Sequence, residues 1–275
     1  TIERHYPQIK SSKTKALDLL NLVMEKQCQL VVDWMRVGFI HGVMNTDNMT
    51  ISGETIDYGP CAFMDQYHPK TVFSSIDKLG RYAYSNQPPI TKWNLTRFAE
   101  CLIPLIDKNE DTAIKIATDV IDNFQNIYEK KWLNMMRDKL GLFGEDKNDR
   151  KLIDDLLNWM EKNKIDYTNI FCHLMDIKID NNTYKDKTFL TWFDEWKKRS
   201  QLNNSSKEKQ IELMKKNNPI VVPRNNKVEE ALTEANNGSL EGMNKLNDIL
   251  KNPYSNQEDI AKYQVPAPTT NEKYQ

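Results

Sequence analysis

The sequence predicts a mainly α-helical fold with one small β-hairpin near residue 50. Two observations lead to this prediction. Apolar residues recur at helical spacing over most of the chain, and one short stretch places β-branched residues on both sides of a turn signal. The helical spacing occurs over residues 11–36, 92–106, 111–140, 149–162, 188–200, 207–216, 227–236 and 240–251. With 275 residues, the chain is long enough to bury a substantial core.

The first long helix is expected over residues 11–36, directly before the turn-containing stretch. Its apolar side chains recur at helical spacing, which places them on one face. They are Leu17, Leu20, Val23, Met24, Cys28, Val31, Val32 and Met35. Ser11 or Ser12 would supply the N-terminal cap. We therefore expect this helix to deliver the loop that follows it, and its apolar face to form part of the core.

The hairpin is predicted between residues 49 and 57. Residues 49–51 and 55–56 carry β-branched side chains, and the Ser-Gly-Glu sequence at 52–54 is typical of a turn. Because a hairpin brings its two ends side by side, the side chains of Asn48 and Asp57 should lie a few ångströms apart. Amide and carboxylate oxygens suit a hard cation, so this pair is expected to hold Mg²⁺, or Mn²⁺ in its place.

The stretch around these two residues has the spacing of a protein-kinase metal site. In kinases, His-Arg-Asp is followed by four residues and a metal-binding Asn, and later by Asp-Phe-Gly. Here His-Gly-Val at 41–43 is followed by four residues and Asn48, and then by Asp-Tyr-Gly at 57–59. Val43 stands where a kinase has the carboxylate that accepts the substrate proton, whereas Asp47 lies directly before Asn48. The pattern indicates a kinase-like metal site whose acid has moved next to the metal.

These residues closely resemble the signature of the selenoprotein O family, pseudokinase-like proteins that transfer AMP rather than phosphate. The resemblance is most specific over residues 41–48 and 56–60, and it extends over most of the chain. Further matches are Gly80-Arg81-Tyr82, Gln87-Pro88, Trp93-Asn94-Leu95, Asn218-Pro219 and Arg224-Asn225.

The resemblance implies a domain organisation. Residues 1–202 would form a protein-kinase-like C-terminal lobe, with the catalytic loop at 38–48, the metal-binding Asp-Tyr-Gly at 57–59 and an activation-like segment at 60–90. Residues 203–275 would form a helical extension that ends in a flexible tail. Family members are expected to carry the other lobe, which holds ATP, N-terminally.

The resemblance also implies an activity, the transfer of AMP from ATP to Ser, Thr or Tyr hydroxyls of proteins. Asn48 and Asp57 would hold Mg²⁺ on the ATP phosphates, so that Asp57 also belongs to the nucleotide site. Asp47 would act as the catalytic base toward the acceptor hydroxyl. The expected partners are therefore ATP and protein substrates.

Part of a nucleotide site is not found in this sequence. A kinase-fold site also needs a glycine-rich loop over the phosphates and a strand Lys paired with a helix Glu. The nine glycines are scattered, and only ten residues precede the first long helix. The chain begins at Thr1 without a Met or a leader, so we expect a processed or cut chain. In isolation it is expected to be an incomplete, inactive fragment.

Two other functions stay open at this stage. A phosphotransferase of kinase-like fold would need Asp47 to take over the role that Val43 cannot perform. A non-catalytic pseudokinase module would bind nucleotide or partner proteins without any transfer. The gain of an AMP unit, of a phosphate or of nothing by a target protein would separate the three functions.

Composition excludes some classes of partner. The 38 basic and 39 acidic residues leave a formal charge of −1, which gives no electrostatic footprint for nucleic acid. No apolar run approaches 18 residues, so no membrane span is expected. The four cysteines are widely spaced and form no zinc or redox motif. Reduced thiols point to the cytoplasm for a bacterial-type chain, or to the mitochondrion for a eukaryotic one.

Overall fold

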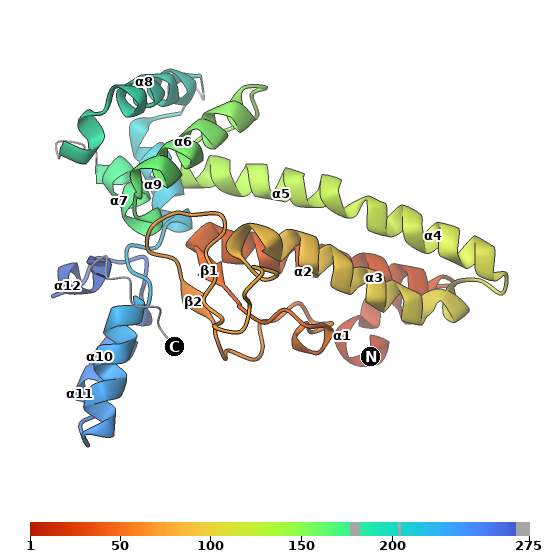
Figure 1. Ribbon diagram of the computed structural model, residues 1–275. Coiled ribbons are helices and arrows are strands. Elements are labelled where there is room, and N and C mark those ends of the chain that lie inside the picture. The colour runs from red at the N-terminus through yellow and green to blue at the C-terminus, as the bar shows by residue number, and fades with distance from the viewer. Residues whose placement is uncertain (177–181, 203–204, 268–275) are drawn as a thin grey trace.

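The computed structural model describes residues 1–176, 182–202 and 205–267, and it is mainly helical, as predicted (Figure 1). The α-helices are α1 (Ile2–His5), α2 (Lys15–Val37), α3 (Gln87–Ile106), α4 (Glu110–Asp122), α5 (Phe124–Lys139), α6 (Asp149–Asn163), α7 (Tyr167–Asp176), α8 (Lys187–Gln201), α9 (Lys207–Asn217), α10 (Asn225–Asn236), α11 (Glu241–Leu250) and α12 (Ala261–Gln264). Short 3-10 helices are η1 (Pro7–Ile9), η2 (Thr46–Asn48), η3 (Tyr84–Asn86) and η4 (Asn182–Lys185).

The long helix α2 confirms the predicted helix before the turn, but its start differs. It begins at Lys15, so the predicted caps at Ser11 and Ser12 are wrong. The physical reason lies in the preceding turn, where the hydroxyls of Ser12 and Thr14 both donate to the carboxylate of Asp18. These bonds hold residues 12–14 outside the helix. The apolar face of α2 is buried along its length, as the periodicity predicted.

The small sheet consists of strands β1 (Phe39–Ile40) and β2 (Ala62–Phe63). The two strands are antiparallel, with Phe39 opposite Phe63 and Ile40 opposite Ala62. The sheet therefore closes both ends of the loop formed by residues 41–61, and it lies outside the predicted hairpin.

The predicted hairpin is reduced to a turn. Its two arms share one isolated bridge, between Met49 and Thr55, and neither arm is a strand. The hydroxyl of Thr50 donates to the Glu54 carbonyl at 2.8 Å and accepts from the Glu54 amide at 2.9 Å. These side-chain bonds take the place of a backbone ladder. The predicted strand positions were therefore wrong, although the turn between them is present.

Two further helix boundaries differ from the prediction. Helix α3 begins at Gln87 rather than at residue 92, because Pro88 and Pro89 occupy its first turn, where a missing amide proton costs nothing. The helix predicted over 111–140 is divided at Asn123 into α4 and α5. The two halves continue in nearly the same direction (Figure 1).

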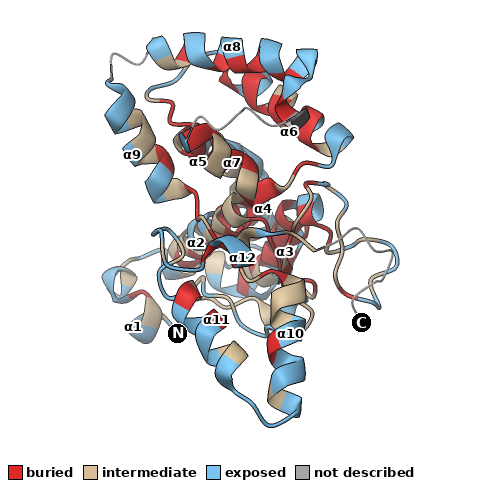
Figure 2. Cartoon of the chain, turned by 90° about the vertical axis from the view of Figure 1, so that its left-hand side faces the viewer, coloured by how far each residue is buried: buried red, intermediate tan, exposed pale blue. Residues whose placement is uncertain are grey.

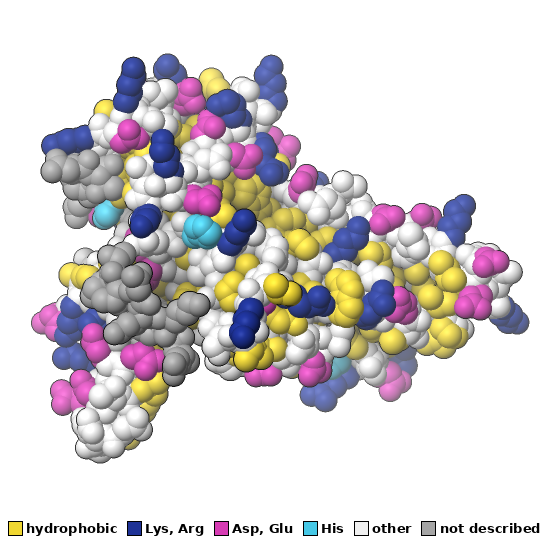
Figure 3. Space-filling view, in the orientation of Figure 1, with side chains coloured by type: hydrophobic (Ala, Val, Ile, Leu, Met, Phe, Trp, Pro, Cys, Tyr) yellow, Lys and Arg dark blue, Asp and Glu magenta, His cyan; other side chains and the backbone are white. Residues whose placement is uncertain are grey.

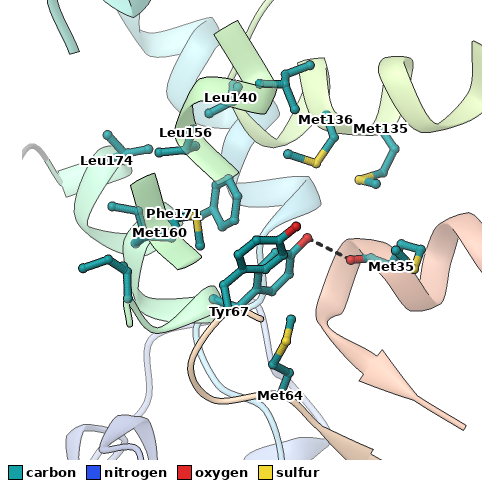
Figure 4. Packing of buried hydrophobic residues seen from close by; sticks show 14 of the residues in the cluster. Met35, Met64, Tyr67, Met135, Met136, Leu140, Leu156, Met160, Phe171 and Leu174 are labelled. Carbon is teal, nitrogen blue, oxygen red and sulfur yellow. Dashed lines mark hydrogen bonds between the residues drawn. The ribbon is translucent and has the colours of Figure 1, made fainter. Parts of the chain in front are cut away.

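Buried side chains form separate clusters, and α2 contributes to two of them. The largest cluster packs the C-terminal half of α2 and the sheet against α5, α6, α7 and α8 (Figures 2 and 4). The second joins the N-terminal half of α2 to α3 and α4. The third lies among the C-terminal helices and consists of Val221, Ala231, Leu246, Ile249, Ile260 and Tyr263. Helices α2, α3 and α5 thus each contribute to both of the larger cores.

A buried arginine fastens the C-terminal helices to the segment that follows β2. Arg224, which is 1% exposed, precedes α10 and places its guanidinium between two carboxylates. It donates to Asp65 at 2.5 Å and to Asp166 at 2.7 and 3.0 Å. It also donates to the carbonyl oxygen of Gln264 at 3.2 Å. One side chain therefore joins the regions around residues 65, 166 and 264.

A second buried ionic cluster fixes α5, α6 and α8. Asp149 is 1% exposed and accepts hydrogen bonds from Arg137 and Arg199, each at 2.7 Å. Burial favours the neutral form of the Asp149 carboxyl. Hydrogen bonds from Arg199, from the Asp146 amide and from Arg137 outweigh it and hold the pKa of Asp149 below its usual value. The carboxylate is therefore the stable form in the folded chain.

Charges of both signs are interspersed over the face of the molecule shown in Figure 3. No single-sign field dominates that face, in keeping with a formal charge of −1. Within residues 1–176, 182–202 and 205–267, no helix combines the length and the apolar character needed to cross a lipid bilayer.

Replacing Asp149 by Asn should lower the free energy of unfolding by about 3–5 kcal/mol near pH 7, because two buried guanidinium groups lose their shared carboxylate. The folded-state pKa of Asp149 lies below its unfolded value, so the carboxylate stabilises the fold above roughly pH 4 and this stabilisation is lost at lower pH. The difference between variant and parent should therefore shrink at pH 3. Urea unfolding at both pH values measures it.

Asp155→Asn is the matched control, because it removes an exposed ion pair with Lys151 on the same helix. This variant should unfold almost as the parent does. An equal loss of stability in the two variants would contradict the special role of Asp149.

Candidate active site

The loop of residues 41–61 is delivered by α2, and two glycines permit its path. Helix α2 ends at Gly38, whose φ of 73° is left-handed, and a Cβ there would lie 3.0 Å from Tyr167. Gly42 has a φ of 84°, and a Cβ there would lie 2.9 Å from the carbonyl oxygen of Pro60. The outgoing and returning arms of the loop can therefore approach each other closely.

Gln87, at the start of α3, holds the backbone on both sides of Ile40. Its amide oxygen accepts from the His41 amide at 3.0 Å, and its amide nitrogen donates to the Phe39 carbonyl, also at 3.0 Å. The side chain is fully buried. A buried, neutral group thus satisfies two backbone groups at the point where the loop begins.

A second amide on α3 and a tyrosine hold the middle of the loop. Asn94 is buried and donates to the Met44 carbonyl at 2.8 Å. The hydroxyl of Tyr82 donates to the side chain of Asn45 at 2.5 Å. Because Gln87 and Asn94 lie seven residues apart, they share one face of α3. That face carries the loop.

His41 links the two arms of the loop from inside the protein. It is 1% exposed, and its Nδ1 accepts from the Val43 amide at 3.3 Å. Nδ1 therefore carries no proton, and Nε2 donates to the Ile56 carbonyl at 2.8 Å. Both ring nitrogens are used in backbone contacts. This arrangement makes His41 a residue that positions the loop.

The turn at residues 49–55 is fastened to α2 as well. The amide of Gln27 donates to the Thr50 carbonyl at 2.5 Å, and the Trp34 indole donates to the Thr55 hydroxyl at 2.9 Å. The hydroxyl of Tyr6 reaches the carbonyl of the residue that follows Thr50. The backbone that carries the candidate site is thus fixed from α2 and from α3.

The predicted site residues keep their oxygens free while the backbone around them is fixed. Asn48 donates from its amide nitrogen to the Val43 carbonyl at 3.0 Å. A carbonyl only accepts, so the nitrogen must face it, and the Asn48 oxygen is left without a hydrogen bond from any described residue. Asp47 and Asp57 are exposed, and within the described residues neither carboxylate has a hydrogen-bond or ion-pair partner. All three side chains can therefore present oxygens to a ligand.

Asp57 has an unusual backbone. Its φ is 58°, in the left-handed region that non-glycine residues seldom occupy. Asp tolerates this region better than most residues, but the conformation still carries a cost that the surrounding structure must meet. Strain of this kind gathers at functional positions, and here it falls on the expected metal ligand.

The donor set fits a hard cation bound partly by non-protein ligands. Among the residues that the structure describes, no three His, Cys, Asp or Glu side chains lie close enough to form a metal site by themselves. Asn48 and Asp57 can supply one amide and one carboxylate oxygen. Mg²⁺ commonly binds one or two carboxylates and fills its remaining positions with water and substrate phosphates. Metal binding at Asn48 and Asp57 stays a prediction.

The structure adds positioning residues that the sequence reasoning did not single out. These are Gln27, His41, Gln87 and Asn94, together with Tyr82. Four of them lie in the motifs on which the family resemblance rests, which is the only signal that marked them. Their roles depend on contacts between residues far apart in the sequence.

Arg81, in the matched motif at residues 80–82, packs against aromatic side chains. Its guanidinium lies 5.0 Å from the ring centre of Trp93 and 5.8 Å from that of Tyr82. Within the described chain it forms no ion pair. Aromatic rings rather than a carboxylate therefore hold Arg81 in place.

Comparison with known proteins identifies the family. Residues 1–251 match the family model described as protein adenylyltransferase SelO. The chain belongs to the SelO family. This confirms the resemblance to selenoprotein O, and the matched range contains the whole loop of residues 41–61.

Curated relatives in the SelO family carry the name protein nucleotidyltransferase YdiU. The protein from Pelagibacter ubique is 64% identical over 100% of this chain and 57% of its own length. The protein from Clostridium perfringens (strain ATCC 13124) is 51% identical over 96% of this chain and 54% of its own length. The protein from Nitrosococcus oceani is 48% identical over 96% of this chain and 54% of its own length. The chain thus spans a little over half the length of these SelO relatives.

Gln87→Leu tests how the SelO loop is held. The substitution keeps the volume of the side chain but leaves the Phe39 carbonyl and the His41 amide unpaired and buried. It should lower the free energy of unfolding by roughly 1–3 kcal/mol for each of the two groups. Amide exchange at His41 should also become faster. Urea unfolding and hydrogen exchange measure the two effects.

Gln29→Leu serves as the control, because Gln29 is an exposed residue of α2. It should change neither quantity appreciably. An unchanged rate of hydrogen exchange at the His41 backbone amide in the Gln87 variant would show that the side chain of Gln87 does not hold this backbone.

Proposed function

We propose that this chain is the part of a protein adenylyltransferase that provides the metal ligands and the base. One observation carries the proposal. Asn48 and Asp57 present oxygens without protein partners, on a loop whose backbone is held by buried side chains of α2 and α3. The names of the family and of the curated relatives support nucleotidyl transfer as the reaction class.

The proposed reaction joins a protein hydroxyl to AMP. The hydroxyl oxygen of a Ser, Thr or Tyr acceptor attacks the α-phosphorus of ATP, the bond to the bridging oxygen breaks, and pyrophosphate leaves. Asp47 takes the proton of the hydroxyl. Asn48 and Asp57 hold Mg²⁺, or Mn²⁺, which supplies positive charge against the charge that develops on the leaving group.

The proposed transfer requires that the base and the metal ligands be held in fixed positions on the loop. Nucleotide transfer depends mainly on positioning and on electrostatic stabilisation. Asp47 and Asn48 are neighbours on η2, so the base and one metal ligand are oriented together. Val43 cannot accept a proton, which favours Asp47 as the base and favours AMP transfer over a kinase reaction at this loop.

The kinase-like architecture is part of the same proposal. A long helix leads into the loop, the Asp-Tyr-Gly segment lies near the end of the loop, and a stretch with little regular structure separates that segment from α3. This order supports a kinase-like C-terminal lobe over residues 1–202 with an extension over 203–275. The separate C-terminal cluster, formed by residues between Val221 and Tyr263, supports the extension.

Two substitutions of Asp57 in the full-length protein test the site. Asp57→Asn keeps a residue that tolerates the left-handed backbone and removes only the charge. Asp57→Ala removes the ligand altogether. Both variants should lower AMP transfer by more than about a hundredfold, because a metal ligand acts directly on the charge of the transition state. Mass measurement of a target protein after incubation with ATP reads the product.

The control is Asp119→Asn, at an exposed position of α4, which should keep full activity. Melting temperatures of all three variants should stay close to that of the parent, since Asp57 is exposed. If the target protein gains phosphate instead of AMP in the presence of the unsubstituted protein, the protein is a kinase. If the target protein gains neither group, the protein is a binding module. A collapsed melting temperature in both Asp57 variants would make Asp57 a structural residue.

The 275-residue chain itself should bind Mg-ATP weakly. Two oxygen ligands on an exposed loop leave the cation mostly hydrated, so we expect a dissociation constant above about 100 µM. Calorimetric titration of the chain with Mg-ATP measures it. Micromolar affinity, or modification of the chain by ATP, would mean that a complete nucleotide site is present.

A further inference from the structure

A hollow of about 320 Å³ lies between α5, α6 and the start of α3 and shares no residue with the loop of residues 41–61. We call it the tyrosine pocket. Its walls include four tyrosines and a tryptophan, namely Tyr67, Tyr84, Tyr128, Tyr167 and Trp132. The region around Tyr67 and Met35 is drawn in Figure 4. Its volume is at the lower end of the range for small-molecule sites.

Two of the four tyrosine hydroxyls are committed to the protein. Those of Tyr84 and Tyr167 both donate to the Met35 carbonyl, at 2.7 and 2.8 Å. No described residue forms a hydrogen bond with the hydroxyl of Tyr67 or of Tyr128. Tyr67 is only 9% exposed, but its hydroxyl oxygen keeps accessible surface where the residue lines the pocket. The hydroxyls of Tyr67 and Tyr128 are therefore open to a ligand that enters the pocket.

The two unpartnered hydroxyls are neutral at physiological pH. Burial, and then the negative charges of Glu161 and Asp154, raise the pKa of Tyr67 to about 12. Burial likewise raises the pKa of Tyr128. Each phenol therefore keeps its proton and offers an oxygen that can accept a hydrogen bond. The charges of Glu161 and Asp154 thus act at Tyr67, whereas the charge of Arg150 lowers the pKa of Tyr128.

The rim of the pocket carries more negative than positive charge. Arg150 lies over the ring of Trp132, 5.1 Å from its centre, and its Nε donates to Asp154 at 2.8 Å. Its Nη1 is 3.9 Å from a carboxylate oxygen of Glu129. The one guanidinium of the rim is thus engaged by two carboxylates. An anion would meet a net repulsion there, whereas a cation would meet carboxylates and aromatic faces.

We propose that the tyrosine pocket binds a small organic cation, a primary amine on an apolar body. The ammonium group would donate to the hydroxyl oxygens of Tyr67 and Tyr128 and face the carboxylates of Glu129 and Asp154. The apolar body would pack against the rings of the wall. The site is independent of the proposed AMP transfer, because none of its groups belongs to the metal and base loop.

Three probes of similar shape and different charge test the proposal by calorimetric titration of the protein at pH 7. They are 2-phenylethylamine, 2-phenylethanol and phenylacetate. The amine should bind with a dissociation constant below about 1 mM and at least tenfold more tightly than the alcohol, and phenylacetate should not bind measurably. Equal binding of the three probes, or no saturable binding of the amine, would overturn the proposal.

Variants locate the binding. Tyr67→Phe and Tyr128→Phe each remove one hydroxyl and keep the ring, and each should weaken binding of the amine at least threefold. Tyr254→Phe, outside the pocket, should leave it unchanged. Because Tyr128 is less deeply buried than Tyr67, the Tyr128 variant keeps the test available if the Tyr67 variant does not fold. Unchanged affinity in Tyr128→Phe would assign the amine to another place.

Discussion

The candidate site depends on one buried amide, the side chain of Gln87. A two-stranded sheet leaves one edge of each strand unpaired, and on β1 that edge presents the Phe39 carbonyl and the His41 amide. These two groups point the same way because they are two residues apart along a strand. Gln87 offers a donor and an acceptor in a peptide-like plane and thereby acts as a single residue of a third strand. The loop of residues 41–61 begins from a backbone held on both edges.

The groups that hold the loop differ in charge from the groups that it presents. Gln27, Gln87, Asn94 and neutral His41 position the backbone without adding a charge. The carboxylates of the site are therefore not neutralised by the structure that holds them, and they remain available to a cation. A rigid backbone beneath free oxygens also limits the reorganisation needed when a ligand binds.

Sequence patterns predicted those parts of the fold that depend on residues close together in the chain. The buried face of α2 follows from periodic apolar residues, and the turn at residues 52–54 follows from its own composition. Strands of two residues are too short to show alternation, so the pairing of Phe39 with Phe63 was not visible. Nor could any local pattern show that Gln87 contacts the His41 amide, 46 positions earlier in the chain. The expected ligand residues were predicted from a motif, whereas the residues that hold the loop beneath them could be recognised only from three-dimensional contacts.

The Arg224 cluster has a consequence for the order of events during synthesis. Arg224 follows Asp65, its partner beside the sheet, by 159 positions. At about 5–20 residues per second, a ribosome needs roughly 8 to 30 s to make the intervening chain. Asp166 precedes Arg224 by only 58 positions, so both carboxylates lack their shared guanidinium only during the last part of that interval. The nascent protein therefore completes the loop of residues 41–61 well before the contact that fastens its C-terminal helices.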